Sequence, residues 1–211
     1  MRRNFLYLLA SAAVLSLASC TTTKFVPDGS YLLDEVKIRT DQKNIRPSSL
    51  RMYVRQNPNA KWFSLIKTQL YVYNLSGRDS TKWGNKFLRR IGDAPVIYSE
   101  DEAKRSDEVI TKALQNMGYM AATVKRSTKI KKKKIKLYYD VTTGKPYVVQ
   151  SIKYDIYDPK IASLLKQDSA RSLLKEGMYL DVNVLDADRQ RITNKLLRNG
   201  YYKFNKDYIG Y

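Results

Sequence analysis

An internal repeat constrains the fold of this 211-residue chain more than any single motif does. The apolar-alternating stretch 31–38 aligns with 147–154, and the stretch 107–119 aligns with 189–201. Alternation predicts a strand in the first pair, and apolar residues at helical spacing predict a helix facing a sheet in the second. Because the two pairs have different offsets, the first copy carries about 34 extra residues, which we place within 57–95.

Capping residues define the predicted helix ends. Ser99 and Asp181 are placed to cap the helix N-termini, and Gly118 and Gly200 are placed to end the helices in the left-handed conformation. The pair Asn199 and Gly200 is also typical of a hairpin turn. The helical period that runs into this pair favours the helix end.

Further sequence patterns predict the remaining strands and helices of each repeat copy. The first copy continues as strands over 119–125 and 135–141, with Lys131 to Lys134 at the tip of the hairpin between them, and a short helix is predicted over 47–55. The predicted order is therefore strand, helix, helix, strand, strand. In the second copy we expect a strand over 147–154, a helix from 159 to 165 or beyond, a helix over 181–199 and a strand over 201–208, without the last strand. The fold class is α+β.

The first twenty residues have the form of an export signal. Arg2 and Arg3 precede an apolar run over 5–17, and small residues lead to Cys20. This run of thirteen residues is too short to cross a bilayer of roughly 30 Å as a helix. The tetrapeptide LASC resembles the bacterial lipoprotein signal, in which the cysteine is lipidated and begins the mature chain. The alternatives are an ordinary signal peptide and a buried core cysteine.

Composition excludes several kinds of chemistry. The chain has a net charge of +19, one cysteine and no histidine. An intramolecular disulfide, a zinc cluster and histidine-based catalysis are therefore excluded. Glu100, Asp101 and Glu102 crowd a predicted helix start, where interaction with the helix dipole is a sufficient role. We predict neither an enzyme nor a metal or cofactor site, and export argues against a nucleic-acid partner.

The β-α-α-β-β order behind a lipoprotein signal resembles POTRA domains, the periplasmic modules of outer-membrane assembly factors in the BamA/TamA superfamily. The stretches TTTKFVPDGSYLLDEVKI, NLSGRDSTKW and LRRIGDAPVIY are similar to the lipid-anchored TamA-like proteins of Bacteroidetes. The resemblance implies a signal peptide over 1–19, a tether over 20–30, one POTRA-like domain over 31–146 and a second over 147–211. It also implies an outer-membrane lipoprotein that faces the periplasm and precedes a C-terminal barrel. No barrel strands follow in this chain, which is a truncated reading frame, a fragment or a stand-alone POTRA protein; the missing last strand of the second copy favours truncation.

A sheet edge offers such a module a way to bind partners. Unpaired N–H and C=O groups accept an incoming strand by β-augmentation, whatever its side chains. The candidate partners are unfolded outer-membrane proteins or a periplasm-spanning protein. The candidate edge residues are Tyr119, Ala121, Thr123, Tyr201 and Lys203, although each segment could equally be an ordinary strand of the sheet.

Two further features have alternative interpretations. Lys131, Lys132, Lys133 and Lys134 could contact anionic lipid, but a solvated hairpin tip that discourages aggregation explains them more simply. Residues 81–92 predict a short amphipathic helix with Trp83 and Phe87 on one face, suited either to packing or to a membrane interface. The alternative function is a stand-alone lipoprotein adaptor that binds envelope proteins or anionic lipid.

Overall fold

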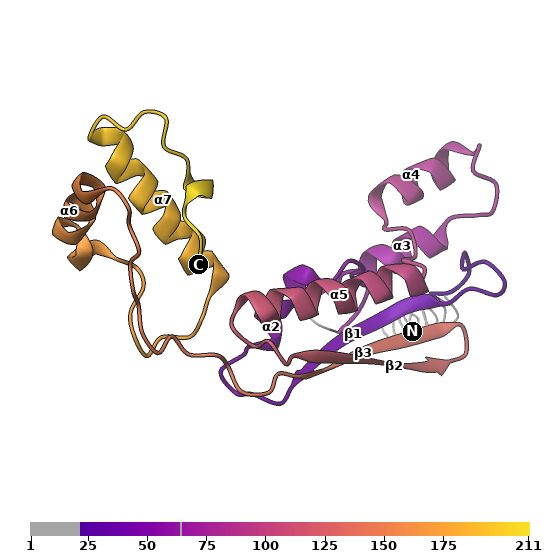
Figure 1. The fold of residues 1–211 in the computed structure, drawn as a ribbon. Helices are drawn as coiled ribbons and strands as arrows, with labels where there is room; N and C mark the ends of the chain where they lie inside the picture. The colour runs from indigo at the N-terminus through magenta and orange to yellow at the C-terminus, as the bar shows by residue number, and fades with distance from the viewer. Residues whose placement is uncertain (1–21, 64) are drawn as a thin grey trace, which may run out of the picture. The chain divides into compact units, whose positions relative to one another are not determined.

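The computed structural model describes residues 22–63 and 65–211 (Figure 1). The predicted signal peptide over 1–19 and Cys20 lie outside these residues. The chain divides into two units, and each is described separately. No helix in the described part of the chain is both long enough and apolar enough to cross a membrane.

The first unit contains a three-stranded sheet with the order β1-β3-β2. Its strands are β1 (Leu32–Thr40), β2 (Thr123–Lys131) and β3 (Lys134–Thr142). The N–H groups of Leu32 and Asp41 donate to the carbonyls of Lys133 and Val141, so β1 runs parallel to β3. The two residues between β2 and β3 make a tight turn, and Lys132 has a φ of 55° there, as a two-residue hairpin requires. The predicted hairpin and α+β class are confirmed.

One face of this sheet is buried beneath helix α5 (Glu100–Asn116). Alternate residues of β3 are buried, as the sequence pattern predicts: Ile135, Leu137, Tyr139 and Val141. The hydroxyl of Tyr139 donates to the carbonyl of Ala103 on α5 at 3.4 Å. Ser99 accepts the N–H of Glu102 at 3.4 Å, so the predicted N-cap of α5 is confirmed.

Short helices account for the rest of the first unit. The predicted helix over 47–55 is divided into α2 (Pro47–Leu50) and the 3₁₀ turn η1 (Arg51–Tyr53). The inserted segment contains α3 (Thr68–Leu75) and α4 (Trp83–Ile91), so a helix within 81–92 is confirmed. Gly92 allows the chain after α4 to approach α3 closely, because a Cβ atom there would lie 2.4 Å from the N atom of Tyr73.

The second unit contains residues 40–45, 108–124 and 141–211, and so includes the C-terminal half of α5. Its other elements are α6 (Pro159–Gln167), η2 (Ser169–Arg171), α7 (Val182–Arg198) and η3 (Lys206–Tyr208). Asp181 accepts the N–H of Asn183 at 2.8 Å and caps α7 as predicted. Gly118 and Gly200 both have a φ of 91°. They therefore end α5 and α7, and the hairpin alternative at Gly200 is wrong.

Two predicted strands of the second copy are wrong in the described chain. Residues 147–154 form only an isolated antiparallel bridge, between Val148 and Tyr179, because the segment 177–180 pairs with them over a short length. Residues 201–208 contain turns and η3, where Asn205 accepts the N–H of Asp207 at 3.3 Å. Apolar alternation without a neighbouring strand is not enough to form a ladder.

Candidate functional site

The outer edge of β2 is the open edge of the sheet within the described chain. Lys133, directly before β3, and Val141, near its end, direct their carbonyls to β1, so the even-numbered residues of β3 face β2. Because the tight turn places Lys131 opposite Lys134, the odd-numbered residues of β2 bond to β3. The main-chain groups of the even-numbered residues therefore point outward: Val124, Arg126, Thr128 and Ile130.

The opposite edge of the sheet, on β1, is covered at the start of the strand. Leu33 donates its N–H to the carbonyl of Val96 at 2.8 Å, and Leu32 forms a bridge with Ile97. Further along β1, the ammonium of Lys67 donates to the carbonyl of Asp34 at 2.7 Å. An incoming strand therefore finds these main-chain groups of β1 already occupied.

Of the five predicted edge residues, only Thr123 lies in a strand. Thr123 is the first residue of β2, whereas Tyr119 and Ala121 precede the strand. The N–H of Tyr119 returns to the carbonyl of Leu114 at the end of α5, and its ring is buried, so the predicted strand over 119–125 begins too early. Tyr201 and Lys203 lie in turns and belong to no strand.

A charged contact holds β2 beneath α5. The guanidinium of Arg126 donates to Glu100 at 2.5 Å and lies 3.6 Å from Asp107. Both acidic groups belong to α5, so the side chain of Arg126 turns towards the helix. Its main-chain groups remain at the outer edge and can take part in pairing.

The four lysines of the hairpin lie at its tip, as predicted. They line a groove of about 620 Å³ together with two further lysines, one aspartate and four uncharged residues: Lys129, Lys136, Asp34, Thr22, Thr23, Tyr71 and Tyr138. Lys133 forms an ion pair with Asp28 at 2.6 Å, and this contact lowers the pKa of Asp28. The groove is therefore strongly basic, and it adjoins the first residues that the structure describes.

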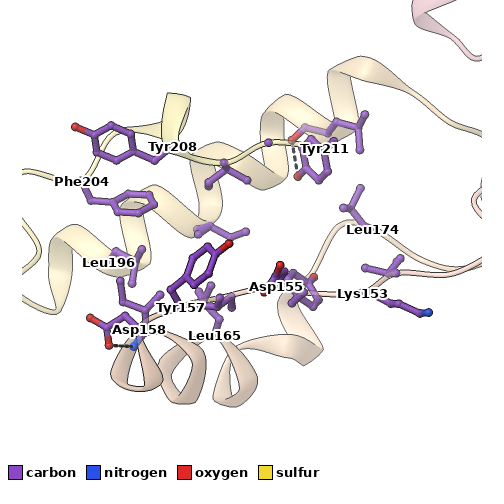
Figure 2. Close-up of a pocket in the computed structure, with 18 of the residues that line it drawn as sticks. Lys153, Asp155, Tyr157, Asp158, Leu165, Leu174, Leu196, Phe204, Tyr208 and Tyr211 are labelled. Carbon is purple, nitrogen blue, oxygen red and sulfur yellow. Dashed lines mark hydrogen bonds between the residues drawn. The ribbon is translucent and has the colours of Figure 1, made fainter.

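The second unit contains an apolar pocket of about 740 Å³ (Figure 2). It lies between α6, α7, the segment 149–158 and the C-terminal residues. Leu165, Leu196, Phe204 and Tyr208 line it, and the hydroxyl of Tyr211 closes one side by donating to the carbonyl of Leu185 at 3.2 Å. Sequence reasoning missed the pocket because its lining residues come from segments that were assigned to separate strands and helices.

No group of three or more histidine, cysteine, aspartate or glutamate side chains suited to a metal ion occurs within 22–63 and 65–211. In the first unit, the β2 edge offers main-chain groups and the hairpin groove offers ammonium groups.

Comparison with known families gives one match. The family model of POTRA, described as surface antigen variable number repeat, matches residues 31–144, more than half of the chain. The chain therefore belongs to the POTRA family. The fold is the α+β fold described above, and the matched region contains the whole three-stranded sheet.

Comparisons with curated proteins and with solved structures add no evidence about the function. No curated protein matches the chain. Among solved structures, the chain is similar to the crystal structure of Haemophilus influenzae BamA POTRA3-5, with 13% identity over 84% of this chain and 89% of that one. The TM-score is 0.29, which is too low to support an argument about the fold.

Proposed function

We propose that this chain is a lipid-anchored periplasmic POTRA module of an outer-membrane protein assembly or translocation factor. It binds unfolded β-segments of client proteins, or a partner protein, by β-augmentation and performs no catalysis. Lipidation at Cys20 places it at the outer membrane, facing the periplasm. The observation that carries the proposal is the open β2 edge in a domain of the POTRA family.

The geometry of β2 supports binding that depends little on client sequence. Main-chain N–H and C=O groups at Thr128 and its even-numbered neighbours present a regular ladder, which any extended segment can match. Exposed Lys125, Lys129 and Lys131 lie along the same strand. Lysines discourage the pairing of two such edges with each other, so the edge stays free for a client.

Residues 147–211 are proposed to be most of a second POTRA-like domain, following the first over 31–146. The support is the repeated helix end: α5 and α7 both stop at a glycine with a φ of 91°. Each is also 17 residues long, and each begins with a side-chain cap.

Photocrosslinking tests the edge. A photoreactive amino acid at Lys125, which is exposed on β2, is incubated with a urea-denatured outer-membrane barrel protein that is diluted into buffer. Thr128→Pro removes an outward N–H group and places a ring on the edge, so we expect crosslinking to be lost. Thr128→Val keeps the N–H group and the branched shape, so crosslinking should persist.

The proline is placed at position 128 because the pairing of β2 with β3 leaves the N–H group of this residue at the outer edge. At Thr123 a proline would remove an N–H group that bonds to β3, so it would damage the sheet itself. Circular dichroism identifies variants that remain folded. Undiminished crosslinking by folded Thr128→Pro protein would show that clients do not use this edge.

A second candidate function is contact with anionic lipid at the hairpin tip, supported by the groove that Lys131 to Lys134 line. Each basic residue near an anionic surface contributes about 1 kcal/mol. Reversing these four charges should abolish salt-sensitive binding to anionic vesicles. Unchanged binding would leave the lysines with a purely structural role.

A further inference from the structure

Helix α4 has two faces of different character. Its inner face is fixed to the loop that follows α3: Asn85 accepts the N–H of Gly77 at 2.7 Å, and its amide donates to the carbonyl of Asp79 at 2.7 Å. Arg89 donates to the hydroxyl of Ser76 at 3.2 Å and to the carbonyl of Gly77 at 3.0 Å. The orientation of α4 within the first unit is therefore set by several polar contacts.

The outer face of α4 carries an unpartnered apolar stripe. Trp83, Phe87 and Ile91 occur four residues apart, so they lie in one line along the helix, and they are 83%, 56% and 49% exposed. Exposed Lys82, Lys86 and Arg90 each directly precede one of them. The helix contains no acidic residue. Aromatic and basic side chains combined in this way suit the boundary of an anionic membrane.

The chain next to the predicted lipid anchor is attached to the same insertion. Lys24 donates to the carbonyls of Asn74 and Ser76 at 3.2 and 2.6 Å, and the amide of Asn74 donates to the carbonyl of Thr22 at 3.5 Å. Val26 is buried against Leu70 of α3. Residues 22–26 are therefore packed, although 20–30 is predicted as a simple tether.

Chain length then limits how far the insertion lies from a membrane. One residue, Thr21, separates Cys20 from Thr22, and these two steps along the chain span at most about 7 Å. A lipid on Cys20 would hold the contact made by Asn74 close to the bilayer surface. The groove of the hairpin lysines includes Thr22 and Thr23, so this part of the unit is basic as well.

We propose that the outer face of α4 docks into the interface of the bilayer that holds the lipid anchor. Trp83, Phe87 and Ile91 lie about 5–10 Å deep at the headgroup–acyl boundary, and the adjacent basic side chains contact headgroup phosphates. The proposal rests on the proposed lipidation of Cys20. It goes beyond client binding, because it gives the insertion the role of orienting the module on the membrane.

Tryptophan fluorescence tests this docking. The chain has two tryptophans, so Trp62→Phe leaves Trp83 as the sole reporter. The mature lipoprotein is reconstituted in phosphatidylethanolamine–phosphatidylglycerol vesicles, with and without lipids brominated near the top of the acyl chains. We expect a blue shift and quenching of Trp83 by the brominated lipid. Lys86→Gln and Arg90→Gln should each weaken the docked state about fivefold.

A matched reporter separates docking from mere proximity. Met52 is 78% exposed on η1, outside α4. In a Trp62→Phe, Trp83→Phe background, Met52→Trp should stay unquenched. Equal quenching at positions 52 and 83, or no quenching at 83, would overturn the proposal. A shift of Trp83 emission that required an added protein would also overturn it and assign this face to a protein partner.

Mass spectrometry of the same sample distinguishes a missing lipid anchor from a failure of α4 to dock. Acylated protein without quenching of Trp83 would refute docking of α4 and leave the lipid anchor intact. Protein without acyl groups whose Trp83 is quenched by added vesicles would refute the anchor and support docking.

Discussion

Arg89 lies over the ring of Phe25, with its guanidinium carbon 5.1 Å from the ring centroid. The same group is 5.8 Å from the centroid of Tyr73, and the rings of Phe25 and Tyr73 meet edge to face at 5.4 Å. One side chain of α4 thus joins the N-terminal segment to α3. This cluster makes the inserted helices and residues 22–26 a single packed element.

Arg89→Lys should loosen this element while keeping its charge. A lysine lacks the planar fork that bonds to Ser76 and Gly77 and stacks on both rings. We expect a loss of about 1–2 kcal/mol in local stability. Hydrogen exchange should accelerate in α3 and α4 and remain unchanged in β3. Exposed Arg90 provides the control, since Arg90→Lys should leave exchange unaffected.

Lys67→Met should destabilise the covered edge of β1. Lys67 is 7% exposed in its side chain and bonds to both the carbonyl and the carboxylate of Asp34. Burial lowers the pKa of Lys67, and the charge of Asp34 opposes that shift. Methionine fills similar space but leaves the carbonyl without its donor, at a cost of about 1–3 kcal/mol. Urea denaturation measures this loss, and an unchanged midpoint would show that the contact contributes nothing.

Glu35 predicts a pH dependence of stability. Lys136 donates to Glu35 at 2.8 Å and lowers its pKa below the ordinary value of 4.5. Because the unfolded chain then binds more protons as the pH falls below 4.5, the stabilisation is present above that pH and is lost below it.

The pair is partly exposed, so its contribution is about 0.5–1 kcal/mol. Glu35→Gln should show this deficit in unfolding free energy at pH 7, and the deficit should vanish as the pH falls well below 4.5. A deficit of constant size across this range would mean that the ion pair is not its source.

Gly118→Ala and Gly200→Ala should differ in cost although both glycines have a φ of 91°. A Cβ atom at Gly118 would lie 2.6 Å from the carbonyl oxygen of Leu180, whereas none of the described atoms lies within 4 Å of one at Gly200. Gly200→Ala should therefore cost only the strain of the left-handed backbone, about 1–2 kcal/mol. Gly118→Ala should cost about 3 kcal/mol or more. Equal costs in thermal unfolding would show that the chain at Leu180 moves aside.

The sequence predicted elements whose stability is mainly local. The alternation from Ile135 to Val141, the capping by Ser99 and Asp181 and the glycine at each helix end all lie in the structure as expected. These signals work because each depends on residues close together in the chain. The prediction was wrong over 201–208, where strand formation needs a distant partner that the described chain does not supply.

The candidate site was predictable only in outline. The sequence indicates an edge near Thr123, but not that alternate residues of β2 turn their main-chain groups outward. It gives no sign that Lys67 and the segment after α4 cover β1. Nor does it show that residues 22–26 are packed, because this packing joins segments about 50 residues apart. Such contacts depend on tertiary arrangement, which periodicity does not encode.

The covering of β1 has a consequence for stoichiometry. A sheet with two open edges can extend in both directions and can polymerise, whereas this sheet can extend on one side only. Once one strand occupies β2, that strand becomes the new border of the sheet, and the covered β1 edge of a neighbouring molecule cannot join it. Only one strand for each module can therefore pair directly with β2, and two modules that met at their free edges would form a closed pair instead of a fibre.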